Sequence, residues 1–291
     1  MKNNSGTKIR DYLQLSKLTI MLPVSLTGFT GYFIFNPHFS FNLVLISFGI
    51  LLMAVSASAL NQIQEAGLDS KMNRTHDRPI PARRIKLKHA IIFSLLNFFP
   101  GIVFIYSGGN LLAALIGLFT VLWYNGIYTY LKRITAFAVV PGALTGALPP
   151  LIGWVAAGGG IVDKPIIFLE FLFFTGQIPH FWLLILKYGE EYNKAGIPNL
   201  TDIFTKDQIN RLTFTWVVTS VIATMFLCYF EIIRTWSIIV ILLTSSAFLI
   251  WRFSSLLKSG ADRNPSKKYS LLLDLYFLLV LLLLIIDRII S

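Results

Sequence analysis

Residues 61–84 read NQIQEAGLDSKMNRTHDRPIPARR, and polar groups of both charges are most concentrated in this stretch. If the preceding apolar helix continues into the stretch, Asn61, Glu65 and Asp69 stand four residues apart and share one helical stripe. Mg²⁺ accepts carboxylate and amide oxygens of this kind, together with waters and phosphate oxygens. The stripe therefore predicts a site for a hard cation where an apolar helix meets water.

Arg74 and Arg78 follow with the same four-residue spacing between them, and Pro79 and Pro81 are expected to stop any helix there. A guanidinium group binds phosphate through two parallel hydrogen bonds. With the acidic stripe, these arginines indicate Mg²⁺ holding a phosphorylated ligand. The alternative is a cytoplasmic loop with ordinary positive charges, although such a loop needs no acids or Asn on its apolar helix.

The composition is that of an integral membrane protein. Hydrophobic residues make up 55% of the 291 residues, charged residues make up 13%, and the mean hydropathy is +0.68. The formal net charge is +11, but the bases lie in short segments between apolar runs, without interleaved aromatic residues. This pattern is typical of membrane topology and of contact with the lipid bilayer, and we exclude nucleic-acid binding.

Nine windows of the sequence reach the length of about 20 apolar residues that crosses ~30 Å of hydrocarbon. They cover residues 16–36, 41–65, 88–107, 110–131, 135–157, 165–188, 210–230, 235–256 and 270–290. The sequence therefore predicts a single all-α domain over residues 1–291, built as a bundle of nine transmembrane helices.

The basic residues orient this bundle. With the N-terminus in the cytoplasm, 22 of the 25 Lys and Arg residues fall in cytoplasmic segments, and the exceptions are Lys164, Arg234 and Arg288. Because cytoplasmic loops carry the excess of Lys and Arg, we predict a multi-pass protein of the inner cell membrane with its N-terminus cytoplasmic and its C-terminus external. The polar segments that hold candidate site residues then face the cytoplasm.

A second acidic segment follows the span 165–188. It begins at Lys187, a candidate cation for ligand binding, and contains Glu190 and Glu191. The predicted topology places it on the same membrane face as residues 61–84, so the two segments can supply two metal sites for one diphosphate. Taken alone, the acidic pair also fits a solvated surface.

Tyr128, Lys132 and Arg133 end the span 110–131, and His180 lies inside the span 165–188. Lys132 is either a phosphate partner or a lysine that extends to the membrane surface. His180 stands eight residues before the end of its span, about 12 Å deep at ~1.5 Å per residue. An ionisable group at that depth faces a cavity or a partner, so His180 is either a hydrogen-bonded core residue or a contact to a bound substrate.

Four ordered motifs within about residues 10–200 resemble the UbiA superfamily of intramembrane prenyltransferases, in the form found in its protoheme IX farnesyltransferase branch. The first is NxxxExxxDxxMxRTxxRPxP over residues 61–81. The others are YT with LKRxT over 128–135, GAxPPLIGW over 146–154, and PHFW with YxxAGIP over 179–198. The last two motifs favour the haem branch of the superfamily.

This resemblance implies a Mg²⁺-dependent enzyme, with Mn²⁺ as a possible substitute, that transfers the farnesyl group of farnesyl diphosphate to the vinyl group of haem b. Haem b is then a substrate and not a cofactor, and a haem A synthase or the assembly of a terminal oxidase is a possible partner. The implied catalytic residues are Asn61, Glu65, Asp69 and Lys132, the implied metal ligands are Asn61, Glu65, Asp69, Glu190 and Glu191, and the implied substrate-binding residues are Arg74, Arg78, Tyr128, Arg133, His180 and Lys187.

The chain departs from the family pattern at several positions. Glu65 stands where the family usually has Asp, and Glu190–Glu191 replaces an Asp of the second acidic motif. Phe137 replaces an Asn, Pro141 a Gly, and residues 16–18 read SKL where the family often has Thr-Lys-Pro. Two alternatives therefore stay open: a prenyltransferase with a quinone precursor or lipid as acceptor, and a membrane protein that handles haem or transports without catalysis.

Overall fold

The computed structural model describes residues 4–257 and 266–291, and this part of the chain consists of helices without strands. The α-helices are α1 (Asn4–Ser16), α2 (Leu18–Phe35), α3 (Phe41–Asp69), α4 (Leu87–Gly108), α5 (Leu111–Leu122), α6 (Thr129–Leu131), α7 (Val139–Ala156), α8 (Lys164–Lys194), α9 (Lys206–Tyr229), α10 (Trp236–Ser254) and α11 (Ser266–Ile290). A π-helical turn, Trp123–Tyr128, joins α5 to α6, and 3₁₀ turns cover Ala136–Ala138, Leu200–Asp202 and Ser255–Leu257.

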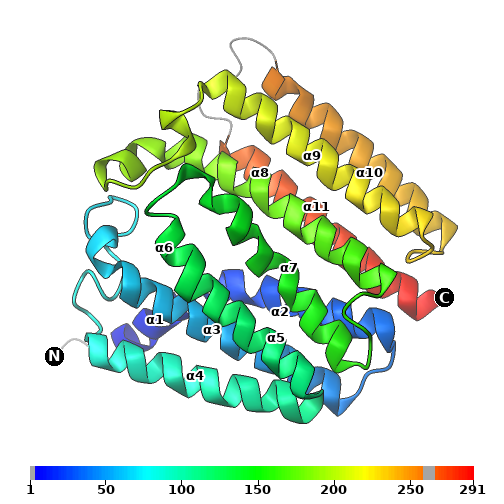
Figure 1. Cartoon of the computed structure of the whole chain (residues 1–291), viewed down its shortest axis with the longest axis horizontal. Helices are drawn as coiled ribbons and strands as arrows, with labels where there is room; N and C mark the ends of the chain where they lie inside the picture. The colour runs from blue at the N-terminus through cyan, green and yellow to red at the C-terminus, as the bar shows by residue number, and fades with distance from the viewer. Residues whose placement is uncertain (1–3, 258–265) are drawn as a thin grey trace.

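Nine helices of the described part are long and apolar enough to cross a membrane, which confirms the predicted number. They form one bundle (Figure 1) and make the chain a multi-pass membrane protein. Two of them, α3 and α8, run beyond the predicted spans, to Asp69 and Lys194. An apolar window ends at the first polar residues, whereas the helix continues because Gln, Glu, Lys and Ala all favour it.

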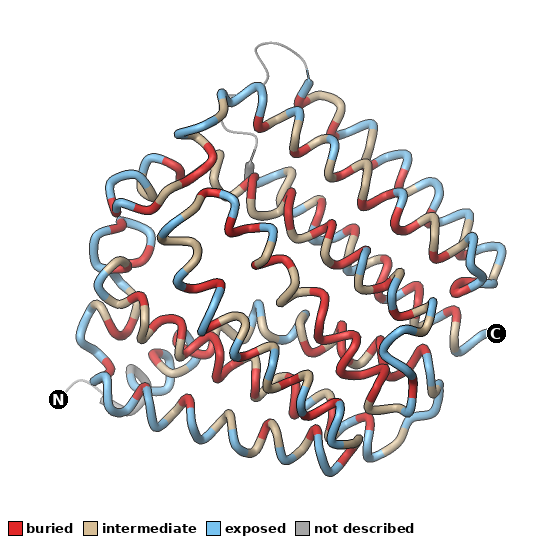
Figure 2. Tube along the Cα trace, viewed as in Figure 1, coloured by how far each residue is buried: buried red, intermediate tan, exposed pale blue. Residues whose placement is uncertain are grey.

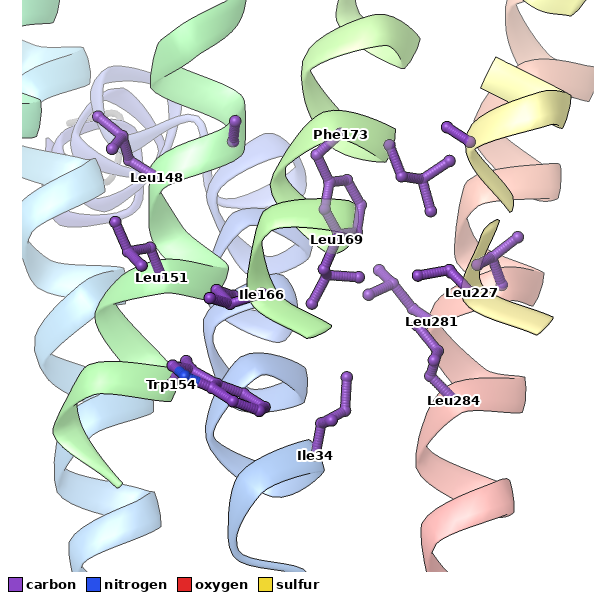
Figure 3. Close-up of a cluster of buried hydrophobic side chains, with 14 of the residues drawn as sticks. Ile34, Leu148, Leu151, Trp154, Ile166, Leu169, Phe173, Leu227, Leu281 and Leu284 are labelled. Carbon is purple, nitrogen blue, oxygen red and sulfur yellow. The ribbon is translucent and has the colours of Figure 1, made fainter. Parts of the chain in front are cut away.

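The bundle closes on itself, since α11 packs against both α2 and α8. Helix α7 lies in its middle (Figure 1). In the most apolar stretch of the span that contains α7, 67% of the residues are buried inside the protein, whereas in α4 the share is 22%. Figure 2 shows the same contrast. The core therefore surrounds α7, and Figure 3 shows part of it, where Trp154 of α7 lies close to Ile166 of α8.

Helices α2 and α7 approach each other at their backbones because glycine leaves room. A methyl group at Gly31 would overlap the backbone of Pro150, and one at Gly153 would overlap the carbonyl oxygen of Gly28. Within a membrane, small residues of this kind let helices pack closely without help from the hydrophobic effect.

The two ends of the bundle differ. Helix α1 and the segments 70–86 and 195–205 lie at one end, and the C-terminus lies at the other (Figure 1). The segments with the candidate site residues are thus gathered at a single end, which we call the polar end.

Candidate functional site at the polar end

The last two turns of α3 carry the predicted acidic stripe into the interior. The helix continues through Asn61, Glu65 and Asp69, as expected, and these residues are only 2%, 7% and 1% exposed. Carboxylates buried to this degree need partners, because an isolated charge loses most of its hydration.

Each of the two carboxylates is paired with a cation from elsewhere in the chain. Lys132 Nζ forms an ion pair with Glu65 Oε1. One nitrogen of Arg78 donates to both oxygens of Asp69, at 2.8 and 2.7 Å. Burial lowers the pKa of Lys132, and the neighbouring Glu65 carboxylate opposes that shift. Glu65 with Lys132 and Asp69 with Arg78 therefore form two compact, mutually neutralising pairs.

The helix ends at Asp69, ten residues before Pro79, so Arg74 and Arg78 follow the helix and are not part of it. Thr75 Oγ1 donates to the carbonyl oxygen of Asp69 at 2.9 Å, and turns follow up to Arg84. This hydroxyl satisfies a carbonyl that the end of a helix leaves free. Because the segment turns back on itself, Arg78 returns to Asp69 and does not stand two turns beyond it.

The π-helical turn directs polar groups of the fourth span towards α3. Asn125 Nδ2 donates to Gln64 Oε1 at 3.1 Å, and Gln64 Nε2 donates to the carbonyl oxygen of Asn125 at 3.0 Å. Asn61 Nδ2 donates to Thr129 Oγ1 at 3.0 Å. Single π turns inside α-helices frequently mark functional sites. Sequence reasoning missed Gln64, Asn125 and Thr129, although polar residues inside apolar spans were a usable signal.

The two polar segments meet at Arg74. Its backbone N–H donates to Glu191 Oε2 at 3.0 Å, and its guanidinium group donates to the hydroxyl of Tyr192 at 3.2 Å and lies over the ring of Tyr188 at 4.8 Å. The structure therefore brings Glu191 to the first segment. Glu190 is exposed to solvent.

Three further predicted residues, Tyr128, Arg133 and Lys187, contact different groups. The ring centroid of Tyr128 is 5.4 Å from Lys132 Nζ, and this buried ring also contacts Phe181 edge-on at 6.2 Å. Arg133 instead donates to the carbonyl oxygen of Gln64 at 2.8 Å. Lys187 is exposed, with its ammonium group 4.7 Å from the ring centroid of Tyr188.

His180 contacts none of these groups and lies deeper in the bundle. Its Nδ1 is 3.0 Å from Oδ1 of Asp274, on α11. The structure thus separates a charged cluster at the polar end from a histidine–carboxylate pair within the spans.

Lys17 lies near enough to the charges of the polar end to feel them, and sequence reasoning did not name it as a candidate site residue. It stands between α1 and α2 in the left-handed region, with φ of 48°. Its pKa is lowered to about 8, mainly by burial and to a smaller extent by the positive charges of Arg78 and Lys132. Its sequence signal was its match to the Lys of the family's Thr-Lys-Pro, between Ser16 and Leu18, which depart from that pattern.

The donor set fits Mg²⁺ in its chemistry, because Glu65, Asp69 and Asn61 supply hard oxygens from one buried stripe. Among the described residues, however, there is no group of three or more His, Cys, Asp or Glu side chains that could hold a metal ion. Both buried carboxylates are instead engaged by Lys132 and Arg78. The predicted five-residue ligand set therefore stays a prediction.

A membrane bundle with buried acids, cations paired to them and an apolar interior is suited to an enzyme that acts on an apolar diphosphate. The model of the UbiA prenyltransferase family matches residues 22–282, and the chain belongs to this family. It is therefore a prenyltransferase.

Relatives and solved structures agree with this assignment. A protoheme IX farnesyltransferase of Nitratidesulfovibrio vulgaris is 34% identical over 226 residues, which are 78% of this chain and 79% of the relative. One of Oleidesulfovibrio alaskensis is 29% identical over 268 residues, 92% and 93% of the two chains.

Two solved structures share the fold. A structure described as that of digeranylgeranylglyceryl phosphate synthase has a TM-score of 0.78 at 22% identity and covers 98% of this chain and 100% of its own. A UbiA homolog from Archaeoglobus fulgidus bound to GPP and Mg²⁺ has a TM-score of 0.71 at 14% identity, covering 96% and 98%.

Proposed function

We propose that this prenyltransferase transfers the farnesyl group of farnesyl diphosphate to a vinyl group of haem b, forming haem O. The names of relatives that cover most of the chain support this reaction. The allylic carbon–oxygen bond breaks and diphosphate leaves. The vinyl group attacks the allylic carbon, and water adds to the resulting cation with loss of a proton. The product would then pass to a haem A synthase or to terminal oxidase assembly.

The observation that carries the donor half is the pair of buried ion pairs, Glu65 with Lys132 and Asp69 with Arg78. Mg²⁺ would be held by Asn61, Glu65 and Asp69 and by Glu190 and Glu191 of the second segment, and it would neutralise the leaving group. Lys132 and Arg78 then exchange their carboxylate partners for phosphate oxygens, which are equally good acceptors. Positive charge around the diphosphate would come from four further cations, Arg74, Arg133, Lys187 and Lys17.

Tyr128 is suited to the next step, when the allylic carbon gains positive charge. Its ring lies beside Lys132 and extends to Phe181 on α8. The face of an aromatic ring attracts a cation, and apolar surroundings limit attack by water before the acceptor reacts. Tyr128 therefore links the diphosphate end of the site to the deeper part in which His180 would meet haem b.

The test is mass spectrometry of the products that purified full-length protein makes from farnesyl diphosphate and Mg²⁺ with haem b or aromatic quinone precursors. We expect farnesylated, hydrated haem from haem b alone. If product formed from a quinone precursor but not from haem b, the proposed acceptor would be wrong and the proposed prenyl transfer would stand. Glu170→Gln is a matched control, because it removes an intramembrane carboxylate that we assign no role.

A further inference from the structure

The pair formed by His180 and Asp274 joins two helices that are far apart in the sequence. His180 Nδ1 of α8 lies 3.0 Å from Asp274 Oδ1 of α11. Nearby, Gly176 makes room for the ring of Phe277, so the two helices run antiparallel at close range here. The close packing fixes the two polar groups opposite each other.

Both groups lie within the membrane. Asp274 stands eight residues after the start of α11, about 12 Å along the helix at ~1.5 Å per residue. His180 stands fourteen residues before the end of α8 at Lys194, about 21 Å along that helix at ~1.5 Å per residue. Ionisable residues at this level are costly in lipid, and they mark substrate paths or partner-bound sites.

The exposure of the pair argues against a packing role. The side chain of His180 is 31% exposed and that of Asp274 is 56% exposed, whereas a histidine that only fills the core would be covered by protein. An imidazole and a carboxylate left open at this depth need another polar or metal-bearing group to cover them. The next residue of α8, Phe181, contacts Tyr128, so the same turn of α8 carries both His180 and an aromatic contact with the fourth span.

We propose that Asp274 is a positioning residue that prepares His180 to bind the iron of the haem acceptor; this inference rests on the proposed function. A proton on Nδ1 of His180 would lie next to the Asp274 carboxylate, 3.0 Å away, and this arrangement would leave the lone pair of Nε2 free for iron. Histidines that bind metals commonly donate their other N–H to a carboxylate, and this makes the imidazole a stronger ligand.

The experiment adds haem b to purified full-length protein in detergent and records its absorption spectrum, its affinity and the ferrous iron–histidine stretching band by resonance Raman spectroscopy. Wild type should show an imidazole-bound haem, and His180→Ala should lose that signature. Asp274→Asn should weaken haem affinity by about ten- to a hundredfold and lower the stretching frequency, because the amide leaves the imidazole less basic. Asp274→Glu should restore both.

Glu170→Gln, which removes a carboxylate from α8 about 15 Å from His180 by helical rise, should leave the spectrum unchanged. A folded Asp274→Asn protein with wild-type affinity and stretching frequency would overturn the role of Asp274 even if the wild type farnesylates haem. A wild type that neither binds haem b nor makes product from it would overturn the proposed function, and this inference with it. Melting temperatures of all variants separate these outcomes from unfolding.

Discussion

Glu65 and Lys132 neutralise each other at the buried end of α3, so each depends on the other's charge. We expect Glu65→Gln to reduce turnover by about a hundredfold or more, because it removes a full charge from a site that must offset a diphosphate. Asp69→Asn should do the same. Glu65→Asp keeps the charge and should keep most of the activity. Steady-state rates with Mg²⁺ and farnesyl diphosphate measure these effects.

Two controls make this result specific. Asp77 belongs to the same segment, but its side chain is 81% exposed, so Asp77→Asn should leave the rate within about twofold of wild type. Glu65→Gln alone leaves the buried ammonium group of Lys132 without its carboxylate and should lower the melting temperature. The double variant Glu65→Gln with Lys132→Met removes both charges, so its melting temperature should rise again while its turnover stays low. Wild-type turnover in Glu65→Gln would move catalysis away from α3.

Lys17 gives the site a pH dependence. Because its pKa is lowered to about 8, its ammonium form predominates at pH 7 and is lost as the pH rises through 8. The charged form binds diphosphate, so kcat/KM for farnesyl diphosphate should fall above pH 8 in the wild type. Lys17→Arg keeps its charge, and its profile should stay flat to at least one pH unit higher. Identical profiles for the two proteins would remove Lys17 from the site.

At the scale of residues, the sequence predicted which side chains lie together only where they are close along the chain. The spacing of Asn61, Glu65 and Asp69 placed them on one buried face. It could not show that Lys17 reaches the same cluster or that Asp274 meets His180, because such partners depend on how distant helices pack. Local periodicity carries no information about those contacts.

Helices α2 and α7 depend on glycine at their contact. Gly31→Ala should destabilise the protein by about 1–3 kcal/mol, because the new methyl overlaps the backbone of Pro150 and the helices must separate. Gly67→Ala is the matched control, since nothing beyond its chain neighbours and the backbone of its own helix lies within 4 Å of the added methyl, and alanine favours a helix. Thermal unfolding in detergent compares the two. Equal melting temperatures would mean that α2 and α7 tolerate a wider separation.

Hydropathy located the helical elements but not their irregularities. It predicted the nine spans, and it ended α3 and α8 too early because their last turns are polar. The turn Trp123–Tyr128 has six residues of ordinary type, and no sequence pattern distinguishes a π turn from an α turn there. Its hydrogen bonds with α3 reveal its purpose only in three dimensions.

For the whole molecule, an odd number of spans places the N-terminus and the C-terminus of the chain on opposite sides of the membrane. With the basic residues inside, a tag inserted after Ala82 should be cytoplasmic and a tag after Ser291 should be external. Protease accessibility in intact cells and in inverted vesicles measures both. Tags on the same side would remove one span and separate the candidate residues from a common face.

The overall fold was largely predictable because membrane helices must satisfy their backbone hydrogen bonds internally and must match the thickness of the bilayer. The orientation follows from charge and is still a prediction. What the sequence left open is the acceptor, since that choice depends on the shape and polarity of surfaces that several helices build together.

The two ion pairs of the polar end also make Lys132 and Arg78 internal competitors of any metal that approaches Glu65 and Asp69. A cation arriving alone must displace an ammonium or guanidinium group that then has no acceptor, whereas a cation arriving with diphosphate supplies one. The affinities for Mg²⁺ and for the diphosphate are thus thermodynamically linked, and each should raise the other by the same factor. Calorimetry should find Mg²⁺ binding weak without inorganic diphosphate and at least tenfold tighter with it, and equal affinities would show that the ion pairs do not compete for the metal. Such linkage would keep the empty enzyme nearly metal-free in the cell and load it only when a donor substrate is at hand.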